Sequence, residues 1–492
     1  MIPINGVTTK STTILVDLRA VFTHPQVEHK LATRGSTVSL RRIMSTSVWM
    51  NYETGLLSEK ECFAQLAEDY HFQACDLAAM IQNLRETTNW DQAAASIFKE
   101  IKRIGTRIFL VSNISKEDYA ALRNRWDNEF WSIFDGVFTS STLGVRKPSL
   151  HFYRHVLRAT RAVPHQTFFV DDSPENVLAA LSVGMRGTYK ISELYRTVTN
   201  FVGDPVERGL AFLRRQGGSF PTTTQHNETI TENYALLVIL EVLNDPQPHL
   251  DSGTSLVVSP PVYPPPLYTR VINTDSGEPK YTSDAYPDDL DTTSLGLLTL
   301  PPDSVIAHSI LDEMHDYIDK DGNVQTYFDK SRPRVDAVVA LNVLTLFHRY
   351  GRGHELPDTM EWIYSVLLNR AYINGTRYYP NAECFLYSLT RLLRVSSDPT
   401  LKERVEAPLR KRVAERVGGA GDAYCLGMRV LACNYLGIDN HPDRQKLADM
   451  QQEDGGWEAS CMYLIPGAKR EVGNRGASTA FAVKALEDWS EQ

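Results

Sequence analysis

The chain has 492 residues, of which 42% are hydrophobic and 23% are charged, and its formal net charge is −9 at pH 7. This length exceeds what one ordinary hydrophobic core supports, so we expect two or three domains of a globular protein. The negative net charge gives no support to binding of nucleic acid or of an anionic membrane surface.

The beginning of the chain and its apolar runs argue against export and membrane insertion. Residues 1–18 contain one lysine and no continuous apolar stretch, unlike a secretory signal. The longest apolar run, residues 234–240, is far too short to span a bilayer. The six cysteines show no CxxC pairing and indicate a reducing compartment. We therefore expect a soluble cytoplasmic protein.

The first 200 residues alternate between predicted strands and helices. Short β-branched runs at residues 12–18, 107–111 and 167–170 predict buried parallel strands. Helical patterns such as residues 90–104 and 150–160 lie between them. This alternation predicts a doubly wound, Rossmann-like α/β sheet. In such sheets, ligands bind at the carboxyl ends of the strands.

Polar side chains follow each of these predicted strands. They are Asp17 after the first strand, Ser112 and Asn113 after the second, and Asp171 and Asp172 after the third. Lys147, in the segment GVRKPS, adds a positive charge between the second and third strands. A carboxylate nucleophile beside a divalent cation can accept a phosphoryl group, and a lysine can neutralise the charge.

In this order and spacing, these residues resemble the four motifs of the haloacid dehalogenase-like superfamily, over about residues 10–200. The resemblance implies that Asp17 attacks phosphate and that Ser112, Asn113 and Lys147 bind it. It also implies that Asp17, Asp171 and Asp172 bind Mg²⁺. The segment of about residues 20–100, with helical patterns such as residues 59–68, looks like the helical cap of this superfamily.

One position departs from that pattern. Many phosphatases of this superfamily carry a second aspartate two residues after the nucleophile, where it protonates the leaving oxygen. Here the position holds Arg19, which cannot act as a general acid near neutral pH. Either another group protonates the leaving oxygen, or the domain is a non-catalytic scaffold that holds the second half or pairs with another copy of the chain.

From residue 204 onward the strand–helix alternation stops, so we place residues 1–203 in one domain and residues 204–492 in another. The second domain is expected to be an all-α arrangement of stacked helices. The predicted helices are residues 206–216, 232–243, 294–300, 304–318, 335–350, 361–371, 382–393, 408–417, 423–435 and 477–489.

A glycine-containing turn recurs between these helices, at residues 215–220, 321–328 and 451–457. In each turn, glycine allows a tight bend and an aromatic residue packs nearby. Three unrelated turns are the alternative interpretation. However, the last one, QQEDGGW, resembles the QxxDGGW repeat of triterpene cyclases, which implies the α/α barrel known as the β domain.

An acidic cluster opens the helix predicted at residues 294–300. Asp288, Asp289 and Asp291 repel one another and are costly to remove from water, which can keep one of them protonated near neutral pH. The simpler interpretation is an acidic helix start with Asp and Thr as caps. With Thr292 and Thr293, the cluster resembles the DxDTT form of the DxDD motif of protonation-initiated (class II) terpene cyclases.

Together, the two halves resemble drimane-type sesquiterpene cyclases, in which a haloacid dehalogenase-like domain precedes one class II cyclase domain with an (α/α)6-type barrel. The resemblance implies that Asp291 is the general acid, held by a hydrogen bond from Asp289. It implies that Thr292 and Thr293 cap the helix and orient water or the carboxyl. The implied substrate is farnesyl diphosphate, cyclised to a bicyclic drimenyl or albicanyl diphosphate.

Cyclisation of this kind requires further groups. Aromatic faces would stabilise the carbocations, although each of these aromatics also fits core packing: the candidates are Phe328, Trp362, Tyr378, Tyr379, Phe385, Tyr387 and Tyr424. Lys469, Arg470 and Arg475 form a late basic cluster for the diphosphate, with a solvated loop as the alternative. Mg²⁺ is expected to bridge the diphosphate in one of the two halves.

The alternative function is a Mg²⁺-dependent phosphatase whose helical half recognises a prenyl phosphate. An active first domain would release an alcohol after cyclisation, whereas an inactive one would leave that step to a separate phosphatase downstream. The product skeleton, the chain length of the substrate and the formation of a homo-oligomer stay open.

Overall fold

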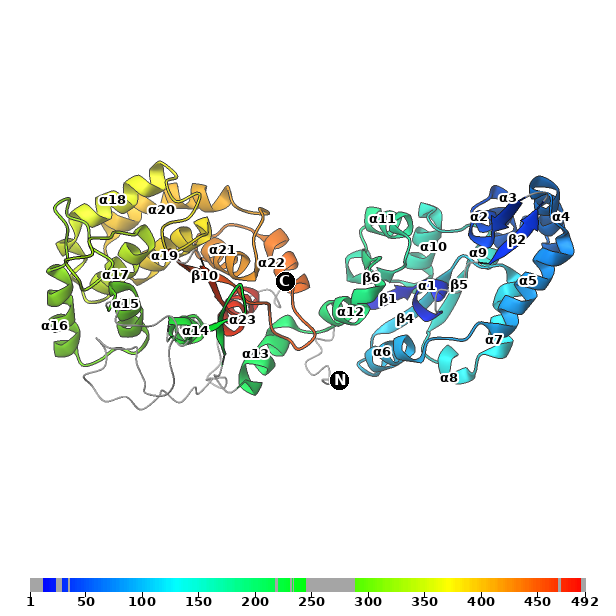
Figure 1. Ribbon diagram of the computed structural model, residues 1–492, viewed down its shortest axis with the longest axis horizontal. Helices are drawn as coiled ribbons and strands as arrows, with labels where there is room; N and C mark the ends of the chain where they lie inside the picture. The colour runs from blue at the N-terminus through cyan, green and yellow to red at the C-terminus, as the bar shows by residue number, and fades with distance from the viewer. Residues whose placement is uncertain are drawn as a thin grey trace. The chain divides into compact units, whose positions relative to one another are not determined.

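A computed structural model describes residues 12–23, 29–33, 36–216, 220–230, 232, 234–244, 288–467 and 470–487. The chain forms two compact units, one ending at Asp204 and the other beginning at Pro205 (Figure 1). No helix in these ranges combines the length and the hydrophobicity that a membrane crossing requires.

A parallel sheet forms the centre of the N-terminal unit, and its strand order over the described residues is β5-β4-β1-β6-β7. The strands are β1 (Thr13–Val16), β4 (Arg107–Ser112), β5 (Gly136–Thr139), β6 (Thr167–Val170) and β7 (Arg186–Thr188). Val16 of β1 pairs with Leu110 of β4 and with Val170 of β6. The segments that follow these three strands therefore emerge at one edge of the sheet. The outer strands β5 and β7 were not predicted, because they are short and lack a long apolar run.

Helices cover both faces of this sheet. Ile14 and Val16 share one core with α1 (Leu18–Phe22), α6 (Gln92–Arg103) and α12 (Leu194–Val202). Leu15 points to the opposite face and joins a core with α10 (Leu150–Thr160) and α11 (Pro174–Ser182). Alternate side chains of one strand thus pack into two cores on opposite faces of the sheet. The predicted doubly wound α/β fold is confirmed.

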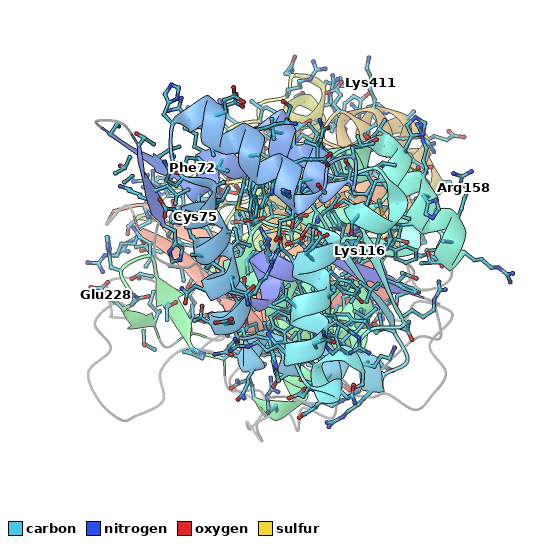
Figure 2. The ribbon with its side chains drawn as sticks, turned by 90° about the vertical axis from the view of Figure 1, so that its right-hand side faces the viewer. Phe72, Cys75, Lys116, Arg158, Glu228 and Lys411 are labelled. Carbon is cyan, nitrogen blue, oxygen red and sulfur yellow. The ribbon has the colours of Figure 1, made fainter. Side chains whose placement is uncertain are left out.

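A small subdomain is inserted between α1 and α6. It comprises a hairpin of β2 (Lys30–Thr33) and β3 (Ser36–Ser39), followed by α2 (Leu40–Met44), α3 (Ser47–Glu53), α4 (Glu59–Tyr70) and α5 (Ala74–Thr87). Trp49, Tyr52 and Phe63 pack in its own core. The hairpin was not predicted. The remaining helices of the unit, α7 (Lys116–Arg125), α8 (Asn128–Trp131) and α9 (Ser140–Leu143), follow β4 and β5; Figure 2 shows Lys116 at the start of α7.

A closed ring of helices builds the C-terminal unit. In the described part of this unit, the ring runs through α14 (Tyr234–Asn244), α15 (Leu290–Thr299), α17 (Ala337–Arg349), α19 (Ala382–Val395), α21 (Ala423–Tyr435) and α23 (Arg475–Leu486). Each of these ring helices packs against the next, and α23 packs against α14 (Figure 1). Residues 337–347 of α17 are buried without interruption, as expected for a helix enclosed on all sides.

Further helices pack around the ring: α13 (Pro205–Arg215), α18 (Pro357–Leu368), α20 (Pro399–Ala414) and α22 (His441–Asp449). The helix α16 (Ser304–His315) contributes Ile310, Leu311 and Met314 to the core of the ring. The predicted helical barrel is confirmed, although α22 was not predicted. The prediction that a helix begins at Pro408 is wrong, because α20 runs through this proline. Asp398 caps α20 at Thr400, and burial of an apolar face on both sides of Pro408 offsets its missing N–H donor.

A small antiparallel sheet accompanies the helices and was not predicted. Its strands are β8 (Thr222–Thr224), β9 (Thr229–Ile230), β10 (Ser460–Ile465) and β11 (Arg470–Asn474), in the order β10-β11-β8-β9. Strands β8 and β9 have only three and two residues, and β8 pairs with β11, more than 200 positions further along the chain. Such pairing leaves little local signal in the sequence.

The QQEDGGW turn fastens the first helix of this unit to the last part of the chain. The Gln451 side-chain amide donates hydrogen bonds to the carbonyls of Pro205 (2.9 Å) and Gly455 (2.8 Å). Gly455 has a φ of +87°, which a residue with a side chain rarely adopts. The fully buried Trp457 donates from Nε1 to the Leu447 carbonyl (2.7 Å). The turn therefore has a structural role. Residues 217–219 of the first such turn lie outside the described residues.

Candidate active sites

The acidic cluster lies at the start of α15, where Asp289 caps the helix. Asp289 Oδ1 accepts a hydrogen bond from the backbone N–H of Thr292 (2.6 Å), and its Oδ2 accepts one from the Thr292 hydroxyl (3.2 Å). The Thr293 hydroxyl donates to the Asp289 carbonyl (2.7 Å). The capping interpretation thus describes Asp289. We had expected the Asp289 side chain to hold the Asp291 carboxyl group. It accepts hydrogen bonds from Thr292 in the first turn of the helix instead.

Two residues from other elements hold the carboxyl group of Asp291. Asn342, on α17, donates from Nδ2 to Asp291 Oδ1. The hydroxyl of Tyr379, in the segment before α19, donates to Asp291 Oδ2. Asp291 is 8% exposed, so these two donors replace most of the water that a carboxylate would otherwise bind.

The surroundings of Asp291 favour its protonated form. Burial, followed by the nearby Asp289 carboxylate, raises the pKa of Asp291 to about 7, even though the hydrogen bonds from Tyr379 and Asn342 lower it. Near neutral pH a substantial fraction of Asp291 is therefore a carboxylic acid. Such a group can donate a proton to a reactant.

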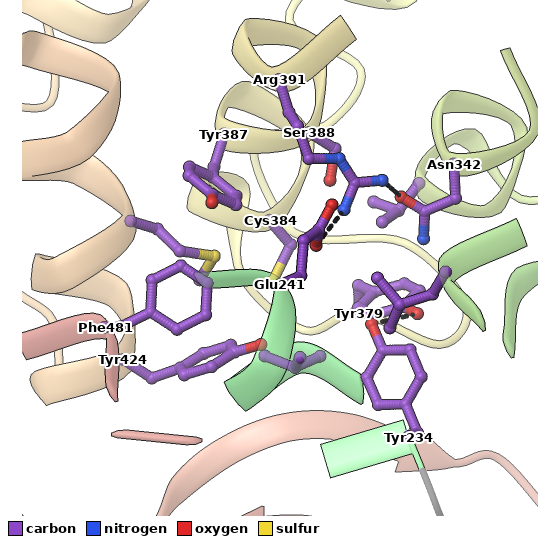
Figure 3. A pocket seen from close by; sticks show the side chains of 14 residues that line it. Tyr234, Glu241, Asn342, Tyr379, Cys384, Tyr387, Ser388, Arg391, Tyr424 and Phe481 are labelled. Atoms are coloured by element: carbon purple, nitrogen blue, oxygen red, sulfur yellow. Dashed lines mark hydrogen bonds and ion pairs between the residues drawn. The ribbon is translucent and has the colours of Figure 1, made fainter. Parts of the chain in front are cut away.

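A small cavity of about 30 Å³ lies inside the ring (Figure 3). Every ring helix contributes to its wall. The lining residues are Tyr234, Val238, Glu241, Leu295, Val338, Asn342, Tyr379, Cys384, Tyr387, Ser388, Arg391, Tyr424, Met428 and Phe481. Asp291 adjoins the cavity through Asn342 and Tyr379, its two hydrogen-bond donors.

The predicted aromatic residues divide between this cavity and the core. Tyr379, Tyr387 and Tyr424 line the cavity, together with Tyr234 and Phe481, which were not among the candidates. The other four are not among the lining residues: Phe328 packs on Tyr317, Phe385 stacks on Tyr372, Tyr378 bonds to Tyr327, and Trp362 packs against the core of the barrel.

A buried ion pair also reaches this cavity and was not predicted. Arg391 Nη1 lies 2.9 Å from Glu241 Oε2, and its Nη2 donates to Asn342 Oδ1 (Figure 3). A signal for both residues exists in the sequence. Glu241 lies in the helix sequence YALLVILEVLN, and Arg391 lies in AECFLYSLTRLLRV. Each is a charged residue on a helix face that is otherwise apolar. Charges at such positions are costly unless they are paired or functional.

The described part of the predicted basic cluster lies elsewhere. Arg475 forms ion pairs with Asp454 (2.9 and 3.0 Å) and stacks over Phe212, and Arg470 pairs with Glu228. Neither arginine lines the cavity. Lys469 lies outside the described residues. The role of the cluster in diphosphate binding stays a prediction.

In the N-terminal unit, Lys147 joins the ends of the central strands. Its ammonium group is 2.6 Å from both Asp17 Oδ1 and Asp171 Oδ2, and it donates to the Val111 carbonyl (3.1 Å). The residue is 1% exposed. Burial lowers the pKa of Lys147, but the Asp17 and Asp171 carboxylates outweigh it, so the pKa lies above its ordinary value.

The other predicted residues of this site differ in what they contact. The Ser112 hydroxyl is buried and has no hydrogen-bond partner among the described residues, so it is available to a ligand. Both amide atoms of Asn113 bond instead to the backbone of Lys147, at 2.9 Å each. Asn113 therefore positions the lysine segment, and the structure does not place it as a ligand-facing group. Asp172 is exposed.

The carboxylates of this site fit a magnesium ion. Mg²⁺ is usually bound by one or two carboxylates, with water and substrate phosphate completing its shell. Asp17 and Asp172 follow neighbouring strands, and Lys147 contacts both Asp17 and Asp171. The described ranges contain no group of three or more His, Cys, Asp or Glu side chains placed to hold a metal. The donor set thus suits Mg²⁺ shared with a phosphate, and not a metal held by protein ligands alone.

Arg19, which replaces the expected second aspartate, is held by a neighbouring helix. Its Nη2 lies 3.5 Å from Asp118 Oδ2, and Asp118 also pairs with Arg85 (2.7 Å). The Arg19 side chain is 40% exposed.

Comparison with known proteins identifies both halves. The profile of the sesquiterpene cyclase astC-like C-terminal domain matches residues 206–350, and that of haloacid dehalogenase-like hydrolases matches residues 12–184. The drimenol cyclase drtB of Aspergillus calidoustus is 40% identical over 456 residues, which are 92% of this chain and 83% of drtB. The chain belongs to the family of drimane-type sesquiterpene cyclases. The family predicted from the sequence is therefore confirmed.

Other relatives match single halves of this cyclase. The sesquiterpene phosphatase astK of Aspergillus oryzae is 33% identical over 162 residues, which are 33% of this chain and 82% of astK. Among solved structures, the type II terpene cyclase MstE from Scytonema matches with a TM-score of 0.42 and 12% identity, over 58% of this chain and 98% of MstE.

Proposed function

We propose that the C-terminal unit cyclises farnesyl diphosphate to a bicyclic drimane-type diphosphate, drimenyl or albicanyl, by protonating the terminal double bond. The observation that carries this proposal is Asp291, a buried acid with a pKa near neutrality beside the cavity of the helical ring. Protonation of an alkene requires an acid that is neutral before the reaction and shielded from water. The relationship to a protein named drimenol cyclase supports the choice of substrate.

The reaction conserves atoms. The O–H bond of Asp291 breaks as a C–H bond forms at the less substituted carbon of the terminal double bond, and the resulting tertiary cation is attacked by the internal double bonds, which closes two rings. Loss of a proton from a neighbouring carbon then restores an alkene, so substrate and product are isomers. The faces of Tyr387, Tyr424 and Phe481 in the cavity wall can stabilise the cations. A proton from solvent restores Asp291.

Product analysis tests this function. The purified chain is incubated with farnesyl or geranylgeranyl diphosphate and Mg²⁺, and the products are identified by mass spectrometry with and without an added phosphatase. A bicyclic C15 skeleton is expected from farnesyl diphosphate. Linear farnesol as the sole product after phosphatase treatment would refute the proposal.

A second candidate function, removal of phosphate from the cyclised product, rests on the N-terminal site. Lys147 joins Asp17 to Asp171, and the buried Ser112 hydroxyl lacks a partner within the described ranges, which fits a phosphate oxygen. Asp17 would attack the phosphorus atom, and Lys147 would offset the negative charge. Mg²⁺ held by Asp17 and Asp172 would supply further charge neutralisation. The relationship to a protein named sesquiterpene phosphatase supports this activity.

The product released by the intact chain distinguishes the alternatives. An active N-terminal unit yields a free bicyclic alcohol, with a group other than Arg19 protonating the leaving oxygen. A scaffold yields the diphosphate and requires a separate phosphatase downstream. An alcohol whose formation persists in Asp17→Asn would exclude this unit as its source.

A further inference from the structure

We propose that Glu241 is a catalytic base of the cyclisation, which removes the last proton from the bicyclic cation and so decides where the product carries its double bond. This inference rests on the proposed cyclisation, because it concerns the final step of that reaction. The acidic cluster at the start of α15 accounts for the acid that begins the reaction, and it leaves open which group ends it.

Glu241 and Arg391 meet across the interior of the helical ring. Glu241 lies on α14 and Arg391 on α19, and these helices occupy opposite positions, with α15 and α17 between them on one side and α21 and α23 on the other. Both residues line the cavity, where Glu241 Oε2 is 2.9 Å from Arg391 Nη1 (Figure 3). The Glu241 carboxylate therefore lies where a substrate inside the ring would contact it.

Stability of the fold does not by itself account for a charged pair at this position. Replacement of a buried ion pair by apolar side chains of similar volume is often neutral or stabilising. Much of the surrounding wall is already apolar, with Val238, Leu295 and Phe481 among its residues. Charges that persist in a cavity suited to a hydrocarbon indicate a chemical role.

The ion pair favours the ionised form of Glu241. Arginine stays protonated in proteins, and the Arg391 side chain is 9% exposed, so its charge requires a buried counter-ion. Burial lowers the pKa of Arg391, but the Glu241 carboxylate, with smaller contributions from other groups, outweighs it and raises the pKa. Glu241 is thus a proton acceptor, whereas Asp291, with a pKa of about 7, can be a donor. Two carboxyl groups in opposite protonation states are the arrangement expected of a base and an acid.

Among the described residues that line the cavity, Glu241 is the strongest base. It is the one carboxylate among them. Burial raises the pKa of the Tyr234, Tyr379 and Tyr424 hydroxyls, so these groups stay protonated and accept a further proton poorly. The guanidinium of Arg391 carries donors only.

The acid and the proposed base lie at separate places beside the cavity. Asn342 contacts Asp291 through its amide nitrogen and Arg391 through its amide oxygen, and Arg391 in turn contacts Glu241. One amide and one guanidinium group therefore separate the two carboxyl groups. This separation suits a product with two fused rings, because the first proton enters at one ring and the last cation forms on the other.

The final step balances as a simple elimination. A C–H bond on a carbon next to the cation breaks, its electron pair forms the double bond, and the proton moves to a carboxylate oxygen of Glu241. Loss from a ring carbon gives the drimenyl skeleton, whereas loss from the methyl group gives the albicanyl skeleton. Glu241 then returns the proton to solvent, which its 21% exposed side chain can reach.

The product ratio of the full-length chain tests this role. Glu241→Gln retains an acceptor for Arg391 but removes the base. Bicyclic skeletons should still form from farnesyl diphosphate. The share that ends as another alkene isomer, or as a tertiary alcohol after water attacks the cation, should rise at least about tenfold. Mass spectrometry after treatment with an added phosphatase measures these shares.

Two further variants separate a chemical role from a structural one. Glu241→Asp keeps the charge but withdraws the carboxylate by one methylene group, so it should change the ratio of alkene isomers, and it decides the question if Glu241→Gln does not fold. Glu383→Gln is the matched control, since Glu383 forms a buried pair with Arg429 at 2.7 Å and does not line the cavity. Its product ratio should equal that of the wild type, even if the chain is less stable.

The outcomes distinguish this inference from the proposed function. A wild-type chain that forms no bicyclic product refutes the function itself. A wild-type chain that cyclises, together with a folded Glu241→Gln chain of unchanged product ratio, overturns the role of Glu241 alone and shows that water or the substrate diphosphate accepts the proton. A lower rate without any change of the ratio also overturns it, because a purely structural effect has this result.

Discussion

Both units of this cyclase bury a carboxylate near a cation, but they arrange the two groups differently. In the N-terminal unit, the Lys147 ammonium contacts Asp17 and Asp171 directly at 2.6 Å. In the C-terminal unit, the neutral amide of Asn342 separates Arg391 from Asp291. Burial raises the pKa of Asp171 above its ordinary value even though the Lys147 contact lowers it. Burial and the Asp289 carboxylate raise the pKa of Asp291 to about 7, and Asp291 receives hydrogen bonds from neutral donors instead of a direct contact with Arg391.

The largest expected effect is the loss of the acid. Asp291→Asn removes the proton donor but keeps the size of the side chain, so bicyclic product should fall by about a thousandfold or more. The rate is measured by mass spectrometry of dephosphorylated products. The exposed Asp288→Asn serves as the control and should retain activity. Cyclisation by a folded Asp291→Asn protein would show that Asp291 is not the proton donor.

Removal of the lysine should be the next largest effect. Lys147→Met leaves Asp17 and Asp171 without their shared cation, which should destabilise the N-terminal unit by about 3–5 kcal/mol and abolish phosphate release. Denaturant unfolding and a phosphate assay measure the two effects. Lys99→Met, which breaks a partly exposed pair with Glu129, should cost less than about 1 kcal/mol. Equal losses in both variants would show that Lys147 has no special role.

The pH dependence of the two reactions should differ. Because the pKa of Asp291 is about 7 and only its protonated form acts, cyclisation should be full below neutrality and fall about tenfold for each pH unit well above it. The rate of phosphate release from a supplied bicyclic diphosphate, measured with the Asp291→Asn chain, should not show this decline above neutral pH. A shared alkaline limit would indicate that one group controls both reactions.

The smallest expected effect is at Arg19. Its side chain is partly exposed and lies 3.5 Å from Asp118, so Arg19→Ala should change the free energy of unfolding by less than about 1 kcal/mol. Phosphate release should stay within about twofold, because arginine cannot act as the general acid. A large loss of phosphate release, measured with the same supplied diphosphate, would show that Arg19 binds the substrate.

Much of the architecture could be predicted because it depends on local patterns. The apolar runs of β1, β4 and β6 are continuous in the sequence, and parallel pairing brings their carboxyl ends together, so Asp17, Lys147 and Asp171 could be expected to meet. The strands β8 and β9 could not be predicted, since they have only three and two residues and β8 pairs with β11 far along the chain.

At the proposed cyclisation site, the sequence by itself singled out Asp291, through the resemblance of residues 289–293 to the DxDTT motif, but not the residues that hold its carboxyl group. The motif could be recognised because it lies within five consecutive residues. Its donors, Asn342 and Tyr379, lie 51 and 88 positions away, and Arg391 and Glu241 are 150 positions apart. Such side chains meet only when the ring of helices closes. The sequence offered helix capping as one interpretation of the acidic cluster, but the tertiary structure alone decided that Asp289 is the cap and that the Asn342 amide, and not a cation, contacts Asp291.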